Sequence, residues 1–214
     1  MNKRWEILPI DEKKQILLEK NLHISSSLAE ILTRKNLDEN SAKLFLNPTK
    51  IPYHDPFLLK DMEKACQRLL LALKNKEKIC IYGDYDVDGV SSTALLMTVF
   101  TKLGFNIDYY LPDRHSEGYG LHIESLQKLI PKYDLLITVD CGITALDEVD
   151  YAKDKIDMII TDHHLPREIL PDAFAIINPT QTQCNYPNKN LCGVGVAFKL
   201  CQGLYQSLNK DIHE

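Results

Sequence analysis

ICIYGDYDVDGV, residues 79–90, decides the fold: a short apolar run ends in a glycine and three alternating aspartates. Four further short apolar runs follow, with helical stretches between most of them. Strands that are apolar throughout are buried on both faces, and such strands separated by helices form a parallel sheet. The sequence therefore predicts an α/β domain with a doubly wound, mostly parallel sheet. Its strands are expected at residues 79–82, 107–111, 135–139, 158–161 and 174–177, and its helices at 90–103, 123–130, 143–153 and 196–208.

The first 75 residues differ from the rest, because they are rich in polar residues and read as helical. Ser27 and Glu30 have the spacing of a capping box, which predicts a helix start there. Three prolines between residues 48 and 56 mark a connector, and residues 61–73 place apolar side chains on one helical face. We expect two domains: a helical N-terminal region, 1–75, and the α/β domain, 76–214.

The composition is that of a soluble globular chain, since 44% of the 214 residues are hydrophobic and 26% are charged. These values exclude a disordered, collagen-like or coiled-coil chain. The net charge of −5 has the wrong sign for a protein that coats nucleic acid nonspecifically. No apolar run approaches the roughly 20 residues that span a bilayer, and the N-terminus lacks a signal peptide's apolar segment. We therefore expect a cytoplasmic protein with no membrane partner.

The six cysteines are at least eight positions apart and form no CxxC pair. This spacing, in a chain without a secretion signal, favours reduced and mostly buried thiols over disulfides or a zinc site. Cys141 is the cysteine nearest to a candidate functional residue, because it follows an aspartate at a predicted strand end.

Acidic residues and histidines follow three of the predicted strands. Asp84, Asp86 and Asp88 follow the first, Asp140 the third, and Asp162-His163-His164 the fourth. Ligands bind outside the carboxyl ends of parallel strands, so these side chains are expected at one edge of the sheet. Residues two apart in an extended segment share a face, and the repulsion between converging aspartates is relieved by a cation. Oxygen ligands with one or two imidazoles suit Mn²⁺ or Mg²⁺.

Each of these motifs also has a purely structural interpretation. The three alternating aspartates could form a solvated turn in which Asp88 caps a helix, Asp140 could cap the helix expected from residue 143, and residues 162–164 could form a surface turn. A calcium loop of the EF-hand type is excluded, because Leu95 occupies the position that requires glutamate. The joint occurrence at three strand ends favours a functional site.

The motifs resemble, in order and context, those of the DHH phosphoesterase superfamily. Further details, EGYGL at residues 117–121 and LCGVGVAF at residues 191–198, resemble the branch of single-strand-specific 5′ to 3′ DNA exonucleases. The resemblance implies a two-metal phosphodiesterase that uses two Mn²⁺ or Mg²⁺ ions and acts in DNA repair and recombination. It implies single-stranded DNA as substrate, with a helicase and a single-strand-binding protein as partners. The motifs are GDYDVDG (83–89), VDCG (139–142), DHH (162–164) and GVG (193–195).

The resemblance also implies a role for each matching residue. Asp86 and Asp88 would each bind one metal ion, Asp140 would bridge the two, and His163 would complete one coordination sphere. His164 would face the scissile phosphate, so that His164 and Asp140 are the expected catalytic residues. Asp84 would orient a ligand or bind metal itself.

Three residues are expected near the substrate. Arg114 would hold a substrate phosphate, with a surface ion pair to Glu117 as the alternative. Gly193 and Gly195 would let the backbone approach a phosphate, although helix-sheet packing explains these two glycines equally well. Cys141 is expected to be a small packing residue behind Asp140.

Two departures from the family pattern stand out. Some members, such as family II pyrophosphatases, carry a metal-binding histidine four residues before the position of Asp86, and here that residue is Tyr82. The family also supplies a further acidic ligand and a second domain downstream of the Gly193 motif. The resemblance therefore implies the N-terminal part of a longer enzyme, inactive by itself.

Other functions remain open at this point. One alternative is a noncatalytic scaffold with the same fold, and another is a sister phosphoesterase that acts on oligoribonucleotides or pyrophosphate. A receiver or flavodoxin-like signalling module also has acidic strand ends, but it does not predict the adjacent His163 and His164.

Overall fold

The chain divides into two compact units after Tyr53. A computed structural model describes residues 9–50 and 53–212. The division expected at residue 75 is therefore wrong: helix α4 (Met62–Asn75) belongs to the second unit. Leu69 and its apolar neighbours on α4 pack into the core of the sheet domain, so the amphipathic face that identified this helix is covered by the sheet and its helices.

The first unit contains three short helices around a small core. Helix α1 (Glu12–Leu22) is followed by α2 (Ser26–Arg34), α3 (Glu39–Leu46) and the single turn η1 (Pro48–Lys50). The cap of α2 is Ser25, whose side chain accepts a hydrogen bond from the backbone N–H of Leu28. The capping box expected at Ser27 is wrong, because Glu30 is paired with Arg34 along the helix. The buried core residues are Leu18, Ala29, Leu32 and Ala42.

The second unit is built on a five-stranded sheet in the order β2-β1-β3-β4-β5, with every neighbouring pair parallel. The predicted parallel α/β fold is confirmed. Because β2 lies on one side of β1 and the later strands lie on the other, the order reverses between β1 and β3, where parallel sheets open a crevice for ligands. The strands are β1 (Lys78–Gly83), β2 (Asn106–Tyr110), β3 (Leu135–Val139), β4 (Asp157–Thr161) and β5 (Ala175–Ile177).

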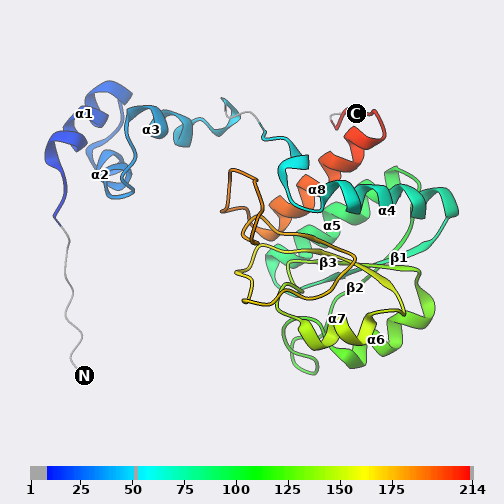
Figure 1. Ribbon diagram of the computed structural model, residues 1–214. Helices are drawn as coiled ribbons and strands as arrows, with labels where there is room; N and C mark the ends of the chain where they lie inside the picture. The colour runs from blue at the N-terminus through cyan, green and yellow to red at the C-terminus, as the bar shows by residue number, and fades with distance from the viewer. Residues whose placement is uncertain (1–8, 51–52, 213–214) are drawn as a thin grey trace, which may run out of the picture. The chain divides into compact units, whose positions relative to one another are not determined.

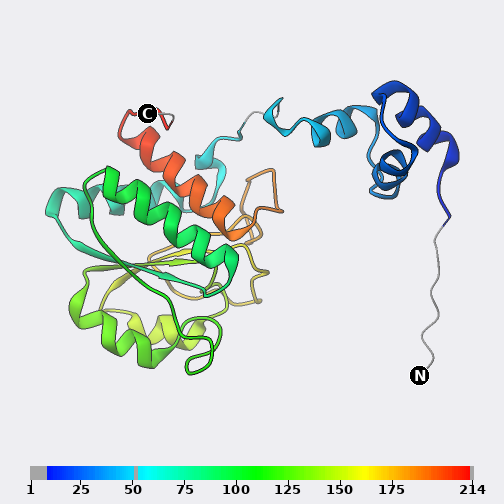
Figure 2. The same ribbon diagram turned by 180° about the vertical axis from the view of Figure 1, so that it is seen from behind.

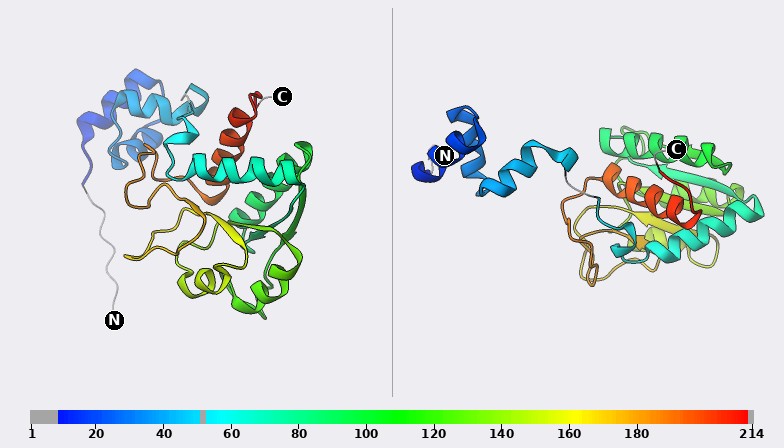
Figure 3. Two further views of the ribbon diagram at one scale, coloured as in Figure 1. Left: turned by 45° about the vertical axis from the view of Figure 1, so that its right-hand side comes forward. Right: turned by 90° about the horizontal axis from the view of Figure 1, so that it is seen from above.

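Helices cover both faces of the sheet (Figure 1). Helices α4, α5 (Val87–Lys102) and α8 (Gly193–Ser207) lie on one face, with α8 between the other two when seen from above (Figure 3). The view from behind shows α5 and α8 side by side (Figure 2). Helices α6 (Ile123–Leu129) and α7 (Leu146–Ala152) cover the other face, and the single turns η2 (Pro56–Leu58) and η3 (Ile130–Lys132) complete the unit.

Alternate residues of each strand serve the two cores. In β1, Ile79 and Ile81 belong to the core beneath α4, α5 and α8, whereas Cys80 and Tyr82 belong to the core beneath α6 and α7. This division explains why the strand is apolar throughout. No helix among residues 9–50 and 53–212 combines the length and the apolar character needed to cross a membrane.

Three helix starts differ from the expected positions, and hydrogen bonds from side chains to the backbone accompany two of these shifts. Helix α5 begins at Val87 because Asp86 caps it, and α8 begins at Gly193. Helix α7 begins three residues late because the backbone N–H of Ile143 is bound by the side chain of Asp162. Two of these three shifts therefore come from aspartates at the carboxyl edge of the sheet.

The placement of α4 can be tested by truncation. A fragment of residues 54–214 is expected to unfold cooperatively on heating, whereas a fragment of residues 76–214 lacks α4 and exposes the apolar surface that it covers. Circular dichroism during thermal unfolding distinguishes the two. Equal melting temperatures for both fragments would contradict the assignment of α4 to the sheet domain.

Candidate metal centre

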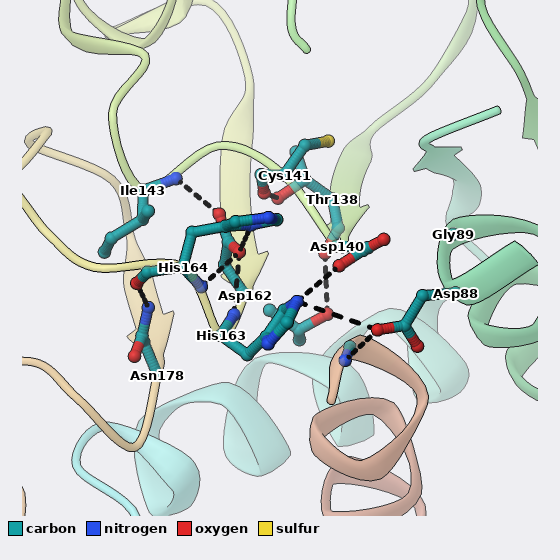
Figure 4. A network of polar contacts seen from close by, with 12 residues as sticks. Asp88, Gly89, Thr138, Asp140, Cys141, Ile143, Asp162, His163, His164 and Asn178 are labelled. Carbon is teal, nitrogen blue, oxygen red and sulfur yellow. Dashed lines mark hydrogen bonds and ion pairs between the residues drawn. The ribbon is translucent and has the colours of Figure 1, made fainter. Parts of the chain in front are cut away.

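Three buried aspartates stand at the carboxyl ends of neighbouring strands. Asp84 follows β1, Asp140 follows β3 and Asp162 follows β4, and their exposed fractions are 1%, 2% and 1%. Strands β1, β3 and β4 are adjacent in the sheet, so the three side chains meet at the crevice where the strand order reverses. Figure 4 shows Asp140, Asp162 and the two histidines at this edge.

Asp86 and Asp88 reach the same edge from the first turn of α5. Asp86 caps the helix by accepting hydrogen bonds from the backbone N–H groups of Asp88 (2.8 Å) and Gly89 (3.0 Å). Asp88 does not cap α5, and the three aspartates do not form one extended segment, so both of these sequence-based expectations are wrong. The Asp88 carboxylate instead accepts hydrogen bonds from the N–H groups of Gly193 (2.6 Å) and Val194 (2.7 Å) at the start of α8.

Asp140 belongs to two groups of potential metal ligands. One group is Asp84, Asp86 and Asp140, and the other is Asp140, His163 and His164, with the ligand atoms of each group within 4.8 Å of one another. His163 Nε2 lies 3.1 Å from Asp140 Oδ1 and 3.6 Å from Asp88 Oδ2 (Figure 4). The structure thus brings Asp84, Asp86, Asp140 and His163 together, whereas Asp88 lies outside both groups and approaches the centre through His163 Nε2.

The site carries negative charge that the described part of the protein does not neutralise. Burial, together with the charges of Asp88 and Asp86, raises the pKa of Asp140 to about 7. Burial also raises the pKa of Asp84. Asp84 Oδ1 is buried and accepts no hydrogen bond from the described residues, and Asp140 Oδ1 is likewise buried, with His163 Nε2 at 3.1 Å as its polar neighbour. Buried carboxylate oxygens next to imidazole are a ligand set that fits hard divalent cations such as Mn²⁺ or Mg²⁺.

Asp162 and His164 form a hydrogen-bonded pair, and the sequence-based interpretation assigned no separate role to the aspartate. His164 Nδ1 lies 2.7 Å from Asp162 Oδ1, and the same oxygen accepts the backbone N–H groups of His163 and His164. Burial alone would raise the pKa of Asp162, but these contacts and the amide of Ile143 together hold it below the ordinary value. The contact with Asp162 raises the pKa of His164. The signal in the sequence was present: Asp162 is the strand-end aspartate of its motif.

Two glycines make room for the acidic residues, Gly89 for the backbone of Asp84 and Gly193 for the side chain of Asp140. A Cβ atom on Gly89 would lie 2.5 Å from the carbonyl oxygen of Asp84, and one on Gly193 would lie 2.5 Å from Asp140 Oδ1. The backbone N–H of Gly193 is engaged by Asp88, so the structure accounts for this glycine through the acidic cluster and not through a phosphate. Gly195 has only ordinary contacts, at 3.5 Å or more, and its role as a substrate contact stays a prediction.

The remaining expected residues lie around the site. Arg114 is exposed, and its guanidinium stands over the ring of Tyr85 at 5.4 Å. The alternative ion pair with Glu117 is wrong, because Glu117 accepts hydrogen bonds from Tyr110, Ser125 and the backbone of Asp113. Cys141 is buried behind Asp140, and burial raises the pKa of its thiol, in agreement with a packing role.

Comparison with known proteins identifies the family. The family model described as "DHH family, N-terminal domain" matches residues 78–214. This match, together with a parallel sheet whose strand ends carry aspartates and the histidine pair, shows that the chain belongs to the DHH family.

The curated relatives are longer than this chain. The single-stranded-DNA-specific exonuclease RecJ of Bacillus subtilis is 43% identical over 98% of this chain and 27% of its own length. RecJ of Escherichia coli is 44% identical over 68% of this chain and 26% of its own length. The chain thus spans about a quarter of the length of these relatives.

Solved structures of RecJ share the fold. A crystal structure of exonuclease RecJ bound to manganese superposes with a TM-score of 0.68 and 34% identity, and it covers 75% of this chain and 41% of that one. RecJ from Thermus thermophilus in complex with Mn²⁺ gives a TM-score of 0.74 with 27% identity, over 97% of this chain and 29% of that one.

The unneutralised charge of Asp140 has a consequence for stability. Asp140→Asn is expected to stabilise the metal-free protein by roughly 1–3 kcal/mol above pH 7, because the buried carboxyl has its pKa raised from 3.8 to about 7. Asparagine also tolerates the left-handed backbone of residue 140, where φ is 62°. The gain should vanish near pH 3, where the carboxyl is protonated in both folded and unfolded chains. Urea unfolding at both pH values measures this, and a variant less stable than the native protein at high pH would contradict it.

The close packing of Gly193 against Asp140 predicts a loss of metal affinity on substitution. Gly193→Ala is expected to weaken Mn²⁺ binding by about 10- to 100-fold, because the new Cβ displaces the Asp140 carboxylate. Gly195→Ala, two residues along the same helix, is the matched control, since its nearest neighbours are 3.5 Å away. Isothermal titration with Mn²⁺ compares them, and equal affinities would rule out the proposed role of Gly193.

Proposed function

We propose that the protein is a metal-dependent phosphodiester hydrolase, a single-stranded-DNA-specific exonuclease that digests from 5′ to 3′ in DNA repair and recombination. The observation that carries this proposal is the position of Asp140, shared by two groups of ligands that together could hold two divalent ions. The similarity to RecJ exonucleases supports the choice of substrate. A cytoplasmic location, and a helicase and a single-strand-binding protein as partners, belong to the same proposal.

Different side chains would bind the two metal ions. Asp84 and Asp86 form one group of ligands with Asp140, and His163 belongs to the other group, so that Asp140 would bridge two ions. Asp88 approaches His163 while its oxygens accept the amides of α8. Two divalent ions bound here would lower the pKa of a water molecule and neutralise charge on the phosphodiester.

His164 is suited to the substrate phosphate. Asp162 fixes the ring through Nδ1, and the raised pKa of His164 favours the protonated imidazolium. The His164 side chain is 43% exposed, and the Tyr119 hydroxyl lies 3.5 Å from its Nε2. A positive donor in this position stabilises the negative charge that develops when the phosphodiester bond breaks.

Digestion of end-labelled DNA tests the proposal. The full-length protein with Mn²⁺ is expected to release mononucleotides from single-stranded DNA with a free 5′ end, and to spare the same strand when its 5′ end is blocked. Asp140→Asn should reduce kcat by more than about 100-fold, since it removes the shared ligand. Metal chelation should have the same effect.

The matched substrates are the same sequence as duplex DNA and as RNA, together with pyrophosphate. Preference for RNA or pyrophosphate would replace the proposed exonuclease by a sister phosphoesterase. Saturable Mn²⁺ binding without hydrolysis of any of these substrates would instead favour a noncatalytic scaffold.

A further inference from the structure

The segment between β2 and α6, residues 111–122, brings two exposed side chains to the metal centre. The Arg114 guanidinium stands over the ring of Tyr85, which lies between the aspartates Asp84 and Asp86. The Tyr119 hydroxyl lies 3.4 Å from His164 Nδ1, and the two rings meet edge-on at 6.0 Å. We call residues 111–122 the β2-α6 loop. Its two contacts connect it to two separate motifs of the candidate metal centre.

Glu117 holds the two ends of this loop together by hydrogen bonds. One carboxylate oxygen, Oε1, accepts hydrogen bonds from the Tyr110 hydroxyl at the end of β2 and from the Ser125 hydroxyl (2.7 Å) in the first turn of α6. The other oxygen, Oε2, accepts the backbone N–H of Asp113 (2.8 Å). A single carboxylate thus joins the strand before the loop, the helix after it and the loop backbone. Ser125 is fully buried, so this junction is anchored in the core.

Tyr82 provides a second anchor from the centre of the sheet. Its hydroxyl donates a hydrogen bond to the carbonyl oxygen of Gly120 (3.0 Å), and its ring lies 5.3 Å from that of Tyr110. The residue is 0% exposed. In some DHH proteins a metal-binding histidine takes this place, but here the hydroxyl is directed to the loop. Gly120, with φ of 91°, has a left-handed backbone that suits glycine, so the carbonyl that Tyr82 binds belongs to a specific turn.

We propose that Glu117 and Tyr82 are positioning residues, which hold the β2-α6 loop so that Arg114 and Tyr119 meet the phosphodiester strand beside the metal centre. This inference rests on the proposed nuclease function and adds the part of the fold that sets substrate affinity. Neither anchor touches a candidate metal ligand in the hydrogen bonds described above. Loss of an anchor therefore loosens the guanidinium and the phenol without changing the carboxylates that hold metal. A loop that is already ordered loses less conformational entropy when substrate binds. The net binding free energy is then more favourable, and KM is lower.

Two conservative variants of the full-length protein test the role. Tyr82→Phe removes only the hydroxyl that binds Gly120, and Glu117→Gln cannot accept all three hydrogen bonds. Each is expected to raise KM for single-stranded DNA by roughly 3- to 10-fold, as the loss of one net hydrogen bond predicts. We expect kcat and the Mn²⁺ affinity, measured by isothermal titration, to stay within about twofold of the native values.

Tyr133→Phe is the matched control. Tyr133 packs against the same core, but its hydroxyl donates to Asp108 Oδ2 (2.9 Å), on strand β2 and outside the β2-α6 loop. If Tyr82 has a purely structural role, Tyr82→Phe and Tyr133→Phe should lower the melting temperature by similar amounts. The two variants should then also have the same KM. A rise in KM that is confined to Tyr82→Phe supports the proposal.

A double-mutant cycle identifies the side chain through which the anchors act. If Glu117 acts through Arg114, then Glu117→Gln should raise KM much less in an Arg114→Ala background than in the native one. Equal effects in both backgrounds, or equal losses of kcat and Mn²⁺ affinity, would overturn the inference. An inactive native protein would instead disprove the proposed function, so the two failures are distinguishable.

Discussion

The carboxylate of Asp140 is almost completely buried among other carboxylates, and several parts of the fold are arranged around it. Its backbone takes a left-handed conformation, with φ of 62°, directly after β3. The Thr138 hydroxyl spans this corner by donating a hydrogen bond to the carbonyl of Cys141, and Thr161 donates in turn to the carbonyl of Thr138. Gly193 leaves the space that the carboxylate occupies. Burying a carboxylate among other carboxylates is costly, so a bound cation would stabilise this arrangement.

The aspartates of the site differ in the hydrogen bonds that stabilise their negative charge. Asp88 accepts two amides at the N-terminus of α8, where the helix dipole also favours a negative charge. Asp162 accepts amides and contacts His164, which holds its pKa low. Asp84 and Asp140 each keep a buried oxygen that no backbone N–H among the described residues reaches, and the one on Asp140 faces His163 Nε2 at 3.1 Å. The protein therefore stabilises the charge of the surrounding aspartates by hydrogen bonds and leaves the central pair without such support, which is the pattern expected of a preorganised cation site.

Local pattern predicted the sheet well, because the strands other than the edge strand β2 are largely apolar and buried, and polar residues follow their ends. It predicted less well wherever the deciding contact comes from far along the chain. Asp88 is bound by amides more than 100 residues away, and the start of α7 depends on Asp162. Helix α4 has an apolar face that could have packed on either unit. Tyr82 was interpreted as a missing ligand, whereas its hydroxyl reaches Gly120, a contact that no local pattern contains.

Anomalous diffraction from crystals soaked in Mn²⁺ tests the central role of Asp140 most directly. We predict two manganese ions, both bound by the Asp140 carboxylate, with Asp84 or Asp86 beside one ion and His163 beside the other. The Asp140→Asn protein should lose at least one of the two ions under the same soak. Two ions that bind without contacting Asp140, or that remain fully occupied in Asp140→Asn, would contradict this account of the site.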